Sequence, residues 1–79
     1  MDLKNKVVVV TGGGNGIGKA LCEKFASLGA KVAVVDLECD AAQQVAESCK
    51  GLGLVADVGV EADIQSVVRD TEAQLGPID

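Results

Sequence analysis

Apolar residues in this 79-residue chain gather in short runs that alternate with longer segments of helical period. Residues 6–11 contain four consecutive valines, and residues 31–36 (KVAVVD) and 52–58 (LGLVADV) form two further apolar runs. Short runs of this kind, without polar alternation, are typical of strands covered on both faces. The pattern therefore predicts three buried strands over these ranges.

Three segments of helical spacing follow these runs. The first begins at Gly16 or Ile17 and stops before Gly29, the second covers residues 42–49 and ends at Lys50-Gly51, and the third runs from about Glu61 to Gly76-Pro77. Glycine after the last periodic position is a frequent helix stop. The apolar positions that carry the three periods are Ile17, Leu21, Phe25 and Leu28; Ala42, Val45, Ala46 and Cys49; and Ile64, Val67, Val68, Thr71 and Leu75.

Alternation of strand and helix predicts an α/β fold, the first half of a doubly wound parallel sheet of the Rossmann type. Right-handed crossovers would order the strands three-two-one, with a glycine-rich turn at the carboxyl end of the first. That first strand is central in a complete sheet, and Ile78-Asp79 would begin a fourth strand beside it. We therefore expect residues 1–79 to be the amino-terminal part of one larger domain.

Composition narrows the class of protein. The net charge is −5, and neither a basic run nor a set of aromatic side chains suggests nucleic-acid binding, because Phe25 is the only aromatic residue. The longest aliphatic run, residues 7–10, is far shorter than a membrane span, and residues 1–6 lack the apolar stretch of a signal peptide. We expect a soluble, cytoplasmic protein.

The three cysteines also favour a reducing compartment. Cys22, Cys39 and Cys49 are odd in number, lack C-x-x-C spacing and have no histidine partner for zinc, so we expect free thiols and no metal site. Cys22 and Cys49 are interpreted as helix-packing residues. The carboxylates Asp63, Asp70 and Glu72 fall on the polar side of the third helix and are expected to face solvent.

The stretch TGGGNGIGKA at residues 11–20 fits two phosphate-binding patterns. From Gly13 it approaches a P-loop with Lys19, but Ala20 replaces the Ser or Thr that would bind magnesium. The dinucleotide pattern instead needs glycines for a tight turn at a helix N-terminus and an acid about 20 residues on. Gly12, Gly16 and Gly18 supply the glycines, and Asp36 follows Gly16 by twenty residues.

The segment TGGGNGIG matches T-G-x-x-x-G-I-G, and here the chain resembles the short-chain dehydrogenase/reductase family. Further matches are Lys6-Val7 at the start of the first strand, Asp57-Val58 at the end of the third, and Gly76 to Asp79 before the fourth. The resemblance implies that the turn holds the adenosine ribose and pyrophosphate of a nicotinamide cofactor, that Asp36 binds the ribose hydroxyls, and that the adenine is bound farther on. The residues implied are Gly12, Gly14, Asn15, Gly16, Ile17 and Gly18 in the turn, Asp36 and Leu37 at the end of the second strand, and Asp57 and Val58 at the end of the third.

The charge of Asp36 predicts NAD in preference to NADP. A 2′-phosphate about 4 Å from a carboxylate would be repelled by up to about 4 kcal/mol per unit charge at an effective dielectric constant near 20. No Arg or Lys stands at position 15 or 37 to offset this repulsion. Structural interpretations remain open, in which Asp36 is only a strand-end carboxylate and Asp57 only caps a turn.

The resemblance further implies hydride transfer between NAD and an alcohol or carbonyl compound, by a protein that forms dimers or tetramers. The proton-transfer residue of the family is a tyrosine, and this sequence contains none, so no catalytic residue is assigned here. The alternative is a Rossmann module that binds a nucleotide or S-adenosylmethionine without transferring hydride.

Overall fold

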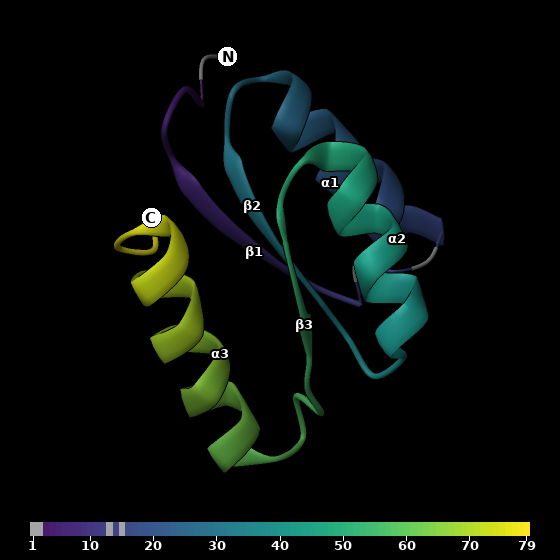
Figure 1. Ribbon diagram of the computed structural model, residues 1–79, viewed down its shortest axis with the longest axis vertical. Coiled ribbons are helices and arrows are strands. Elements are labelled where there is room, and N and C mark those ends of the chain that lie inside the picture. The colour runs from purple at the N-terminus through teal and green to yellow at the C-terminus, as the bar shows by residue number, and fades with distance from the viewer. Residues whose placement is uncertain (1–2, 13, 15) are drawn as a thin grey trace.

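The computed structural model describes residues 3–12, 14 and 16–79, which form three strands and three helices in strict alternation (Figure 1). The predicted cofactor contact Asn15 lies outside the described residues. The elements are β1 (Val7–Thr11), α1 (Gly16–Ser27), β2 (Lys31–Asp36), α2 (Cys39–Cys49), β3 (Leu52–Val55) and α3 (Glu61–Leu75).

The three strands form one parallel sheet in the order β1-β2-β3, which confirms the predicted order. In this sheet Val7 of β1 is level with Lys31 of β2, and Ala33 of β2 is level with Leu52 of β3. Helices α1 and α2 cover one face of the sheet, and α3 covers the other (Figure 1). The chain therefore adopts the α/β, Rossmann-type architecture that its alternating pattern predicts.

Alternate side chains of the strands enter two separate apolar cores. Val10, Val32 and Val34 pack with Cys22 of α1 and with buried residues of α2, whereas Val35 packs with residues on the α3 side. Residues 32–36 of β2 are all buried, as expected for the middle strand of a sheet covered on both faces. The members of the second core are Val35, Ala56 and Val67, with Val9 and Leu54 packed against them.

Strand β3 is shorter than its apolar run predicts. It ends at Val55, because its ladder pairs Leu52 to Val55 with Ala33 to Asp36 and β2 goes no further. The next residue, Ala56, donates its N–H to the Asp36 carbonyl at 3.1 Å, and the chain then turns. The expectation of a strand to Val58 was wrong, and Asp57 and Val58 lie in the connection to α3.

Two helices also differ from their apolar periods. Helix α2 begins at Cys39, before Ala42, the first position of its apolar period. Ile17 and Leu21 of α1 are 82% and 44% exposed, and the buried residue of that helix is Cys22. Cys22 and Cys49 do pack between the helices as predicted, and all three cysteines are free thiols.

At the end of α2, Lys50 adopts the left-handed backbone conformation and Gly51 allows a close approach to β2. Lys50 adopts the left-handed conformation, with φ of 55°, and its N–H bonds to helix carbonyls. Gly51 is needed for space, because a β-carbon there would lie 2.3 Å from the Val32 carbonyl oxygen. This close approach brings β3 beside β2 directly after the helix.

Asp79 lies against the free edge of β1. Its N–H donates to the Val7 carbonyl at 3.0 Å, and its carboxylate Oδ2 accepts from the Val7 N–H at 2.9 Å. Strand β1 is at the edge of the three-stranded sheet, so these bonds occupy backbone groups that β2 does not cover. None of the described helices is long and apolar enough to cross a membrane.

Thr71 of α3 is fully buried, and its hydroxyl has no hydrogen-bond partner among the described residues. An unsatisfied buried hydroxyl costs about 1 to 3 kcal/mol. We expect Thr71→Val to raise the free energy of unfolding of the full-length protein by about 1 kcal/mol in urea titrations. Thr71→Ser, which keeps the hydroxyl and removes a methyl group, should lower it by about 1 kcal/mol. A loss of stability in the valine variant would contradict this prediction.

The three thiols should differ in reactivity, because alkylation proceeds through the thiolate. Burial raises the pKa of Cys22 to about 11 and also raises the pKa of Cys49, whereas Cys39 is exposed at the start of α2. We expect iodoacetamide at about pH 8 to modify Cys39 first and to leave Cys22 unmodified until the protein unfolds. Mass spectrometry of the tryptic peptides gives the order, and early modification of Cys22 would contradict the burial described here.

Candidate functional site

The carboxyl ends of the three strands and the start of α1 form one edge of the molecule. Strand β1 ends at Thr11, and α1 begins at Gly16, so the intervening turn leads straight into a helix N-terminus. The first N–H groups of a helix have no partner within it and favour a negative charge. This edge is therefore suited to bind an anion such as a phosphate.

Gly12 and Gly16 provide the backbone conformation of this turn and leave room above it. Their φ angles are 66° and 33°, in the left-handed region that favours glycine. A β-carbon built on either residue would meet nothing within 4 Å. The backbone at both positions thus faces open space that a phosphate group can approach.

The Asp36 carboxylate is held beside this turn. Asp36 is the last residue of β2, and only 8% of its surface is exposed. Its Oδ2 accepts a hydrogen bond from the Gly14 N–H at 3.0 Å, and its Oδ1 accepts one from the Glu38 N–H at 3.0 Å. A carboxylate has about four acceptor positions, and the bonds from the described residues use two of them.

Exposed apolar side chains lie on the segments that meet at this edge. Leu37 follows Asp36 and is 66% exposed, and Val58 after β3 is 53% exposed. Ile17 in the first turn of α1 is also exposed, while Gly18 behind it is half-buried. Large apolar side chains left in solvent beside polar backbone groups are common in ligand sites.

Asp57 has a structural partner on each side. Its Oδ1 accepts from the Gly59 N–H at 2.8 Å, and its own N–H donates to Oδ2 of Asp63 at 2.9 Å. The expectation that Asp63 only faces solvent was therefore wrong, since it is half-buried and bonded to the turn. The bond to Gly59 is the turn cap that the structural interpretation of Asp57 predicted, whereas the bond to Asp63 had no sequence signal beyond a carboxylate in the first turn of a helix.

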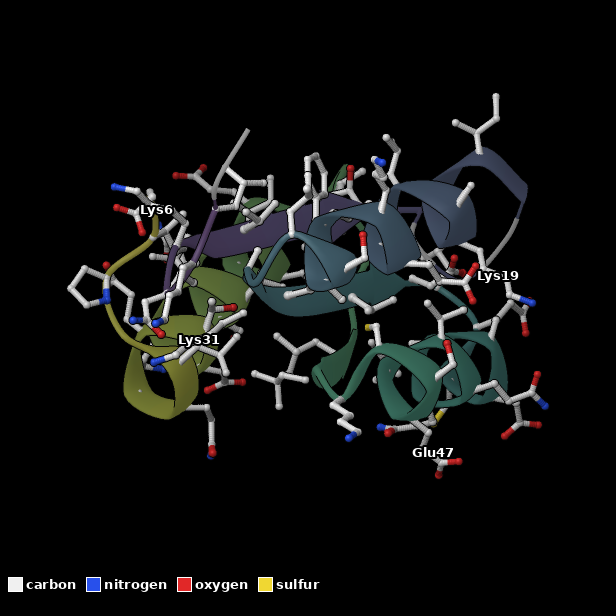
Figure 2. All side chains as sticks on the ribbon, turned by 90° about the horizontal axis from the view of Figure 1, so that it is seen from above. Lys6, Lys19, Lys31 and Glu47 are labelled. Atoms are coloured by element: carbon white, nitrogen blue, oxygen red, sulfur yellow. The ribbon has the colours of Figure 1, made fainter. Side chains whose placement is uncertain are left out.

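Lys19, the lysine of the P-loop interpretation, is exposed on α1. Figure 2 shows it at the opposite end of the molecule from Lys6 and Lys31, which lie at the amino ends of β1 and β2. Lys19 is thus at the same end as the glycine turn, and the neighbouring Ala20 offers no oxygen to a magnesium ion. No cluster of metal-ligating side chains occurs in the described part of the chain.

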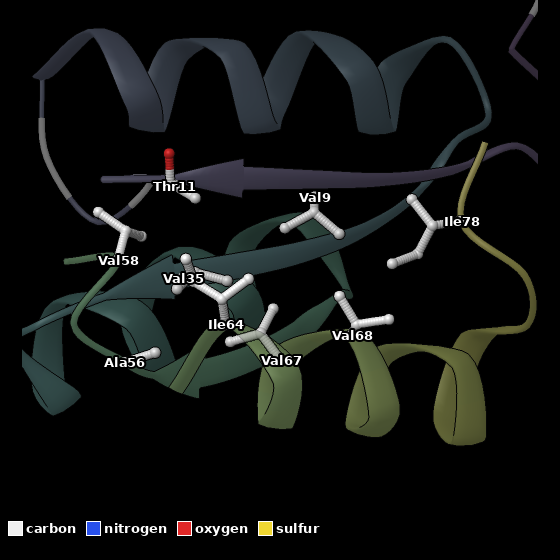
Figure 3. Close-up of a pocket in the computed structure, with 9 residues that line it drawn as sticks. All are labelled: Val9, Thr11, Val35, Ala56, Val58, Ile64, Val67, Val68 and Ile78. Atoms are coloured by element: carbon white, nitrogen blue, oxygen red, sulfur yellow. The ribbon is translucent and has the colours of Figure 1, made fainter. Parts of the chain in front are cut away.

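A separate apolar cavity of about 170 Å³ lies between the sheet and α3 (Figure 3). Ile64 and Val68 of α3 line it and remain 44% and 41% exposed, although their period predicts core positions. Val67 between them is buried as predicted. The full lining is Val9, Thr11, Val35, Ala56, Val58, Ile64, Val67, Val68 and Ile78.

Residues 6–79 match the family model for short chain dehydrogenase. The chain belongs to the short-chain dehydrogenase family, as the glycine turn and the matches along the chain predicted.

Two curated relatives and one solved structure support this assignment. The chain is 44% identical over 81 residues to cis-2,3-dihydrobiphenyl-2,3-diol dehydrogenase of Pseudomonas sp. (strain KKS102), covering 100% of this chain and 29% of the relative. It is 38% identical over 80 residues to 2,5-dichloro-2,5-cyclohexadiene-1,4-diol dehydrogenase of Sphingobium indicum, covering 99% and 32%.

The solved structure is 3-ketoacyl-(acyl-carrier-protein) reductase from Brucella melitensis complexed with NADH. It superposes with a TM-score of 0.96 at 35% identity, covering 99% of this chain and 33% of that one. The chain thus spans about a third of the length of the proteins it matches.

Proposed function

We propose that this chain is the cofactor-binding, amino-terminal part of an NAD-dependent oxidoreductase that interconverts an alcohol and a carbonyl compound. The observation that carries the proposal is the Asp36 carboxylate, buried at the end of β2 and bonded to the glycine turn through the Gly14 N–H. A phosphate-binding turn and a ribose-binding acid are thereby joined at one edge of the sheet.

The described residues fit a dinucleotide. The open backbone at Gly12 and Gly16 and the start of α1 would hold the pyrophosphate. The acceptor positions of Asp36 that no described residue uses would accept from the hydroxyls of a ribose. Leu37 and Val58 would contact the adenine. The bound nicotinamide would supply the hydride donor or acceptor of the reaction.

Charge around Asp36 favours NAD over NADP. Asp36, Glu38 and Asp40 place three carboxylates within five residues, and the positions between them hold no cation. A 2′-phosphate on the ribose would enter this negative region without an arginine or lysine at position 15 or 37. The repulsion from Asp36 alone reaches about 4 kcal/mol per unit charge at about 4 Å.

The remaining properties concern the whole protein. The residues for proton transfer would lie in sequence that follows the described chain, because this chain contains no tyrosine. We propose that residues 1–79 belong to one Rossmann domain whose sheet continues beside β1, where Asp79 already bonds to Val7. We also propose that the whole protein forms a homo-oligomer, either a dimer or a tetramer. A cytoplasmic location would suit its three cysteines, which form no disulfide among the described residues.

Substitution of Asp36 tests the choice of cofactor. We expect the full-length protein to bind NADH more tightly than NADPH, and Asp36→Ala to reduce that preference by about tenfold or more. Fluorescence titration with each nucleotide gives both dissociation constants. Equal affinity of the wild-type protein for the two would contradict NAD selectivity, and binding of S-adenosylmethionine with neither nucleotide would favour the alternative module.

A substitution of Asp57 can separate its role as a turn cap from the proposed role, in which its carboxylate accepts a hydrogen bond from the adenine amino group. In Asp57→Asn the amide oxygen can still accept from the Gly59 N–H, but an NH₂ group replaces the second oxygen and would oppose the adenine amino group. We expect NADH to bind about fivefold more weakly to this variant, at unchanged thermal stability. Unchanged affinity would leave Asp57 with the structural role alone.

A further inference from the structure

Gly14 occupies the narrowest place in the described part of the glycine turn. A β-carbon built on it would lie 2.7 Å from the β-carbon of Ala41 in α2 and 2.9 Å from Oδ2 of Asp36. Both distances are shorter than real side chains tolerate, and the first is to a group that cannot rotate away. A side chain at position 14 would therefore require the turn, α2 or the Asp36 carboxylate to shift.

The other described glycines of the turn serve a different purpose. Gly12 and Gly16 need their left-handed φ angles and face open space, whereas Gly14 is enclosed between α2 and β2. The Gly14 N–H is also the group that bonds to Oδ2 of Asp36, at 3.0 Å. Gly14 thus affects Oδ2 of Asp36 in two ways: it has no side chain to push this oxygen away, and its N–H donates a hydrogen bond to it.

We propose that Gly14 is a positioning residue for cofactor selection, which acts through Asp36. By holding Oδ2 it directs the carboxylate toward the adenosine ribose, where the carboxylate accepts from the hydroxyls and repels a 2′-phosphate. This inference rests on the proposed function. Gly14 would then influence the choice between NADH and NADPH, in addition to any general effect on phosphate binding.

The test is the ratio of the NADPH and NADH dissociation constants, measured by fluorescence titration of the full-length protein. In Gly14→Ala the new methyl group would separate the turn from Asp36, so NADH loses its ribose hydrogen bonds and NADPH meets less repulsion. We expect the ratio to fall about fivefold or more. In the Asp36→Ala background the same substitution should leave the ratio unchanged, because the carboxylate through which it acts is gone.

Gly16→Ala is the control on the pyrophosphate side of the turn: its β-carbon meets open space, and its φ of 33° strains the backbone there and not beside Asp36. It should weaken both nucleotides alike and leave their ratio unchanged. An unaltered ratio in Gly14→Ala, or an equal fall in the Asp36→Ala background, would overturn the inference. If the wild-type protein binds neither nucleotide, the proposed function itself has failed, which is a different result.

Amide hydrogen exchange without nucleotide provides a second measurement that needs no substitution at position 14. The Gly14 N–H should exchange about tenfold faster in Asp36→Ala than in the wild-type protein, because its acceptor has been removed. Gly53, whose amide lies in the β2–β3 ladder region, serves as the internal reference. Equal exchange at Gly14 in the two proteins would overturn the inference even if Gly14→Ala does not fold.

Discussion

Burial of β2 on both faces and pairing on both of its edges is the constraint on which this structure depends. Val32, Val34 and Val35 are almost fully buried, and they belong to two cores that need helices on opposite sides of the sheet. A middle strand of this kind fixes the neighbours β1 and β3 and, through their right-handed crossovers, the sides on which the helices lie. The site is a product of the same arrangement, because Asp36 is simply where the buried strand stops.

The glycine turn and the carboxylate come from segments 22 residues apart in sequence, and among the described residues the hydrogen bond from the Gly14 N–H joins them. The turn alone can approach many kinds of phosphate, since its contribution is backbone geometry and helix charge. The carboxylate alone is one of many acidic side chains in a chain of net charge −5. The two features together, at one edge of the sheet, indicate a dinucleotide site, whereas neither feature alone would do so.

The sequence predicted the bounds of β2 and α3 well, because an apolar pattern with clear stops decides both. The helical period of α3 was a poorer guide to burial, since Ile64 and Val68 are exposed. It misplaced the end of β3, because apolar residues continue past Val55 while the strand that must pair with them has ended at Asp36. Ile17 fits the helical period of α1 yet is exposed, because it lies in the first turn of that helix, at the edge of the molecule. The bond between Gly14 and Asp36 joins separate elements, so no local pattern could reveal it, whereas the Asp63 bond is local and lacked a distinctive pattern.

The two backbone hydrogen bonds to Asp36 have a thermodynamic consequence for recognition. A free carboxylate on a surface samples several rotamers, and ordering a side chain on binding costs roughly 0.5 to 1.5 kcal/mol. Here the Gly14 and Glu38 N–H groups restrict both oxygens before any nucleotide arrives. That conformational entropy is lost when the protein folds, so the carboxylate is preorganised, and the ribose that we propose as its ligand would meet an acid that is already ordered.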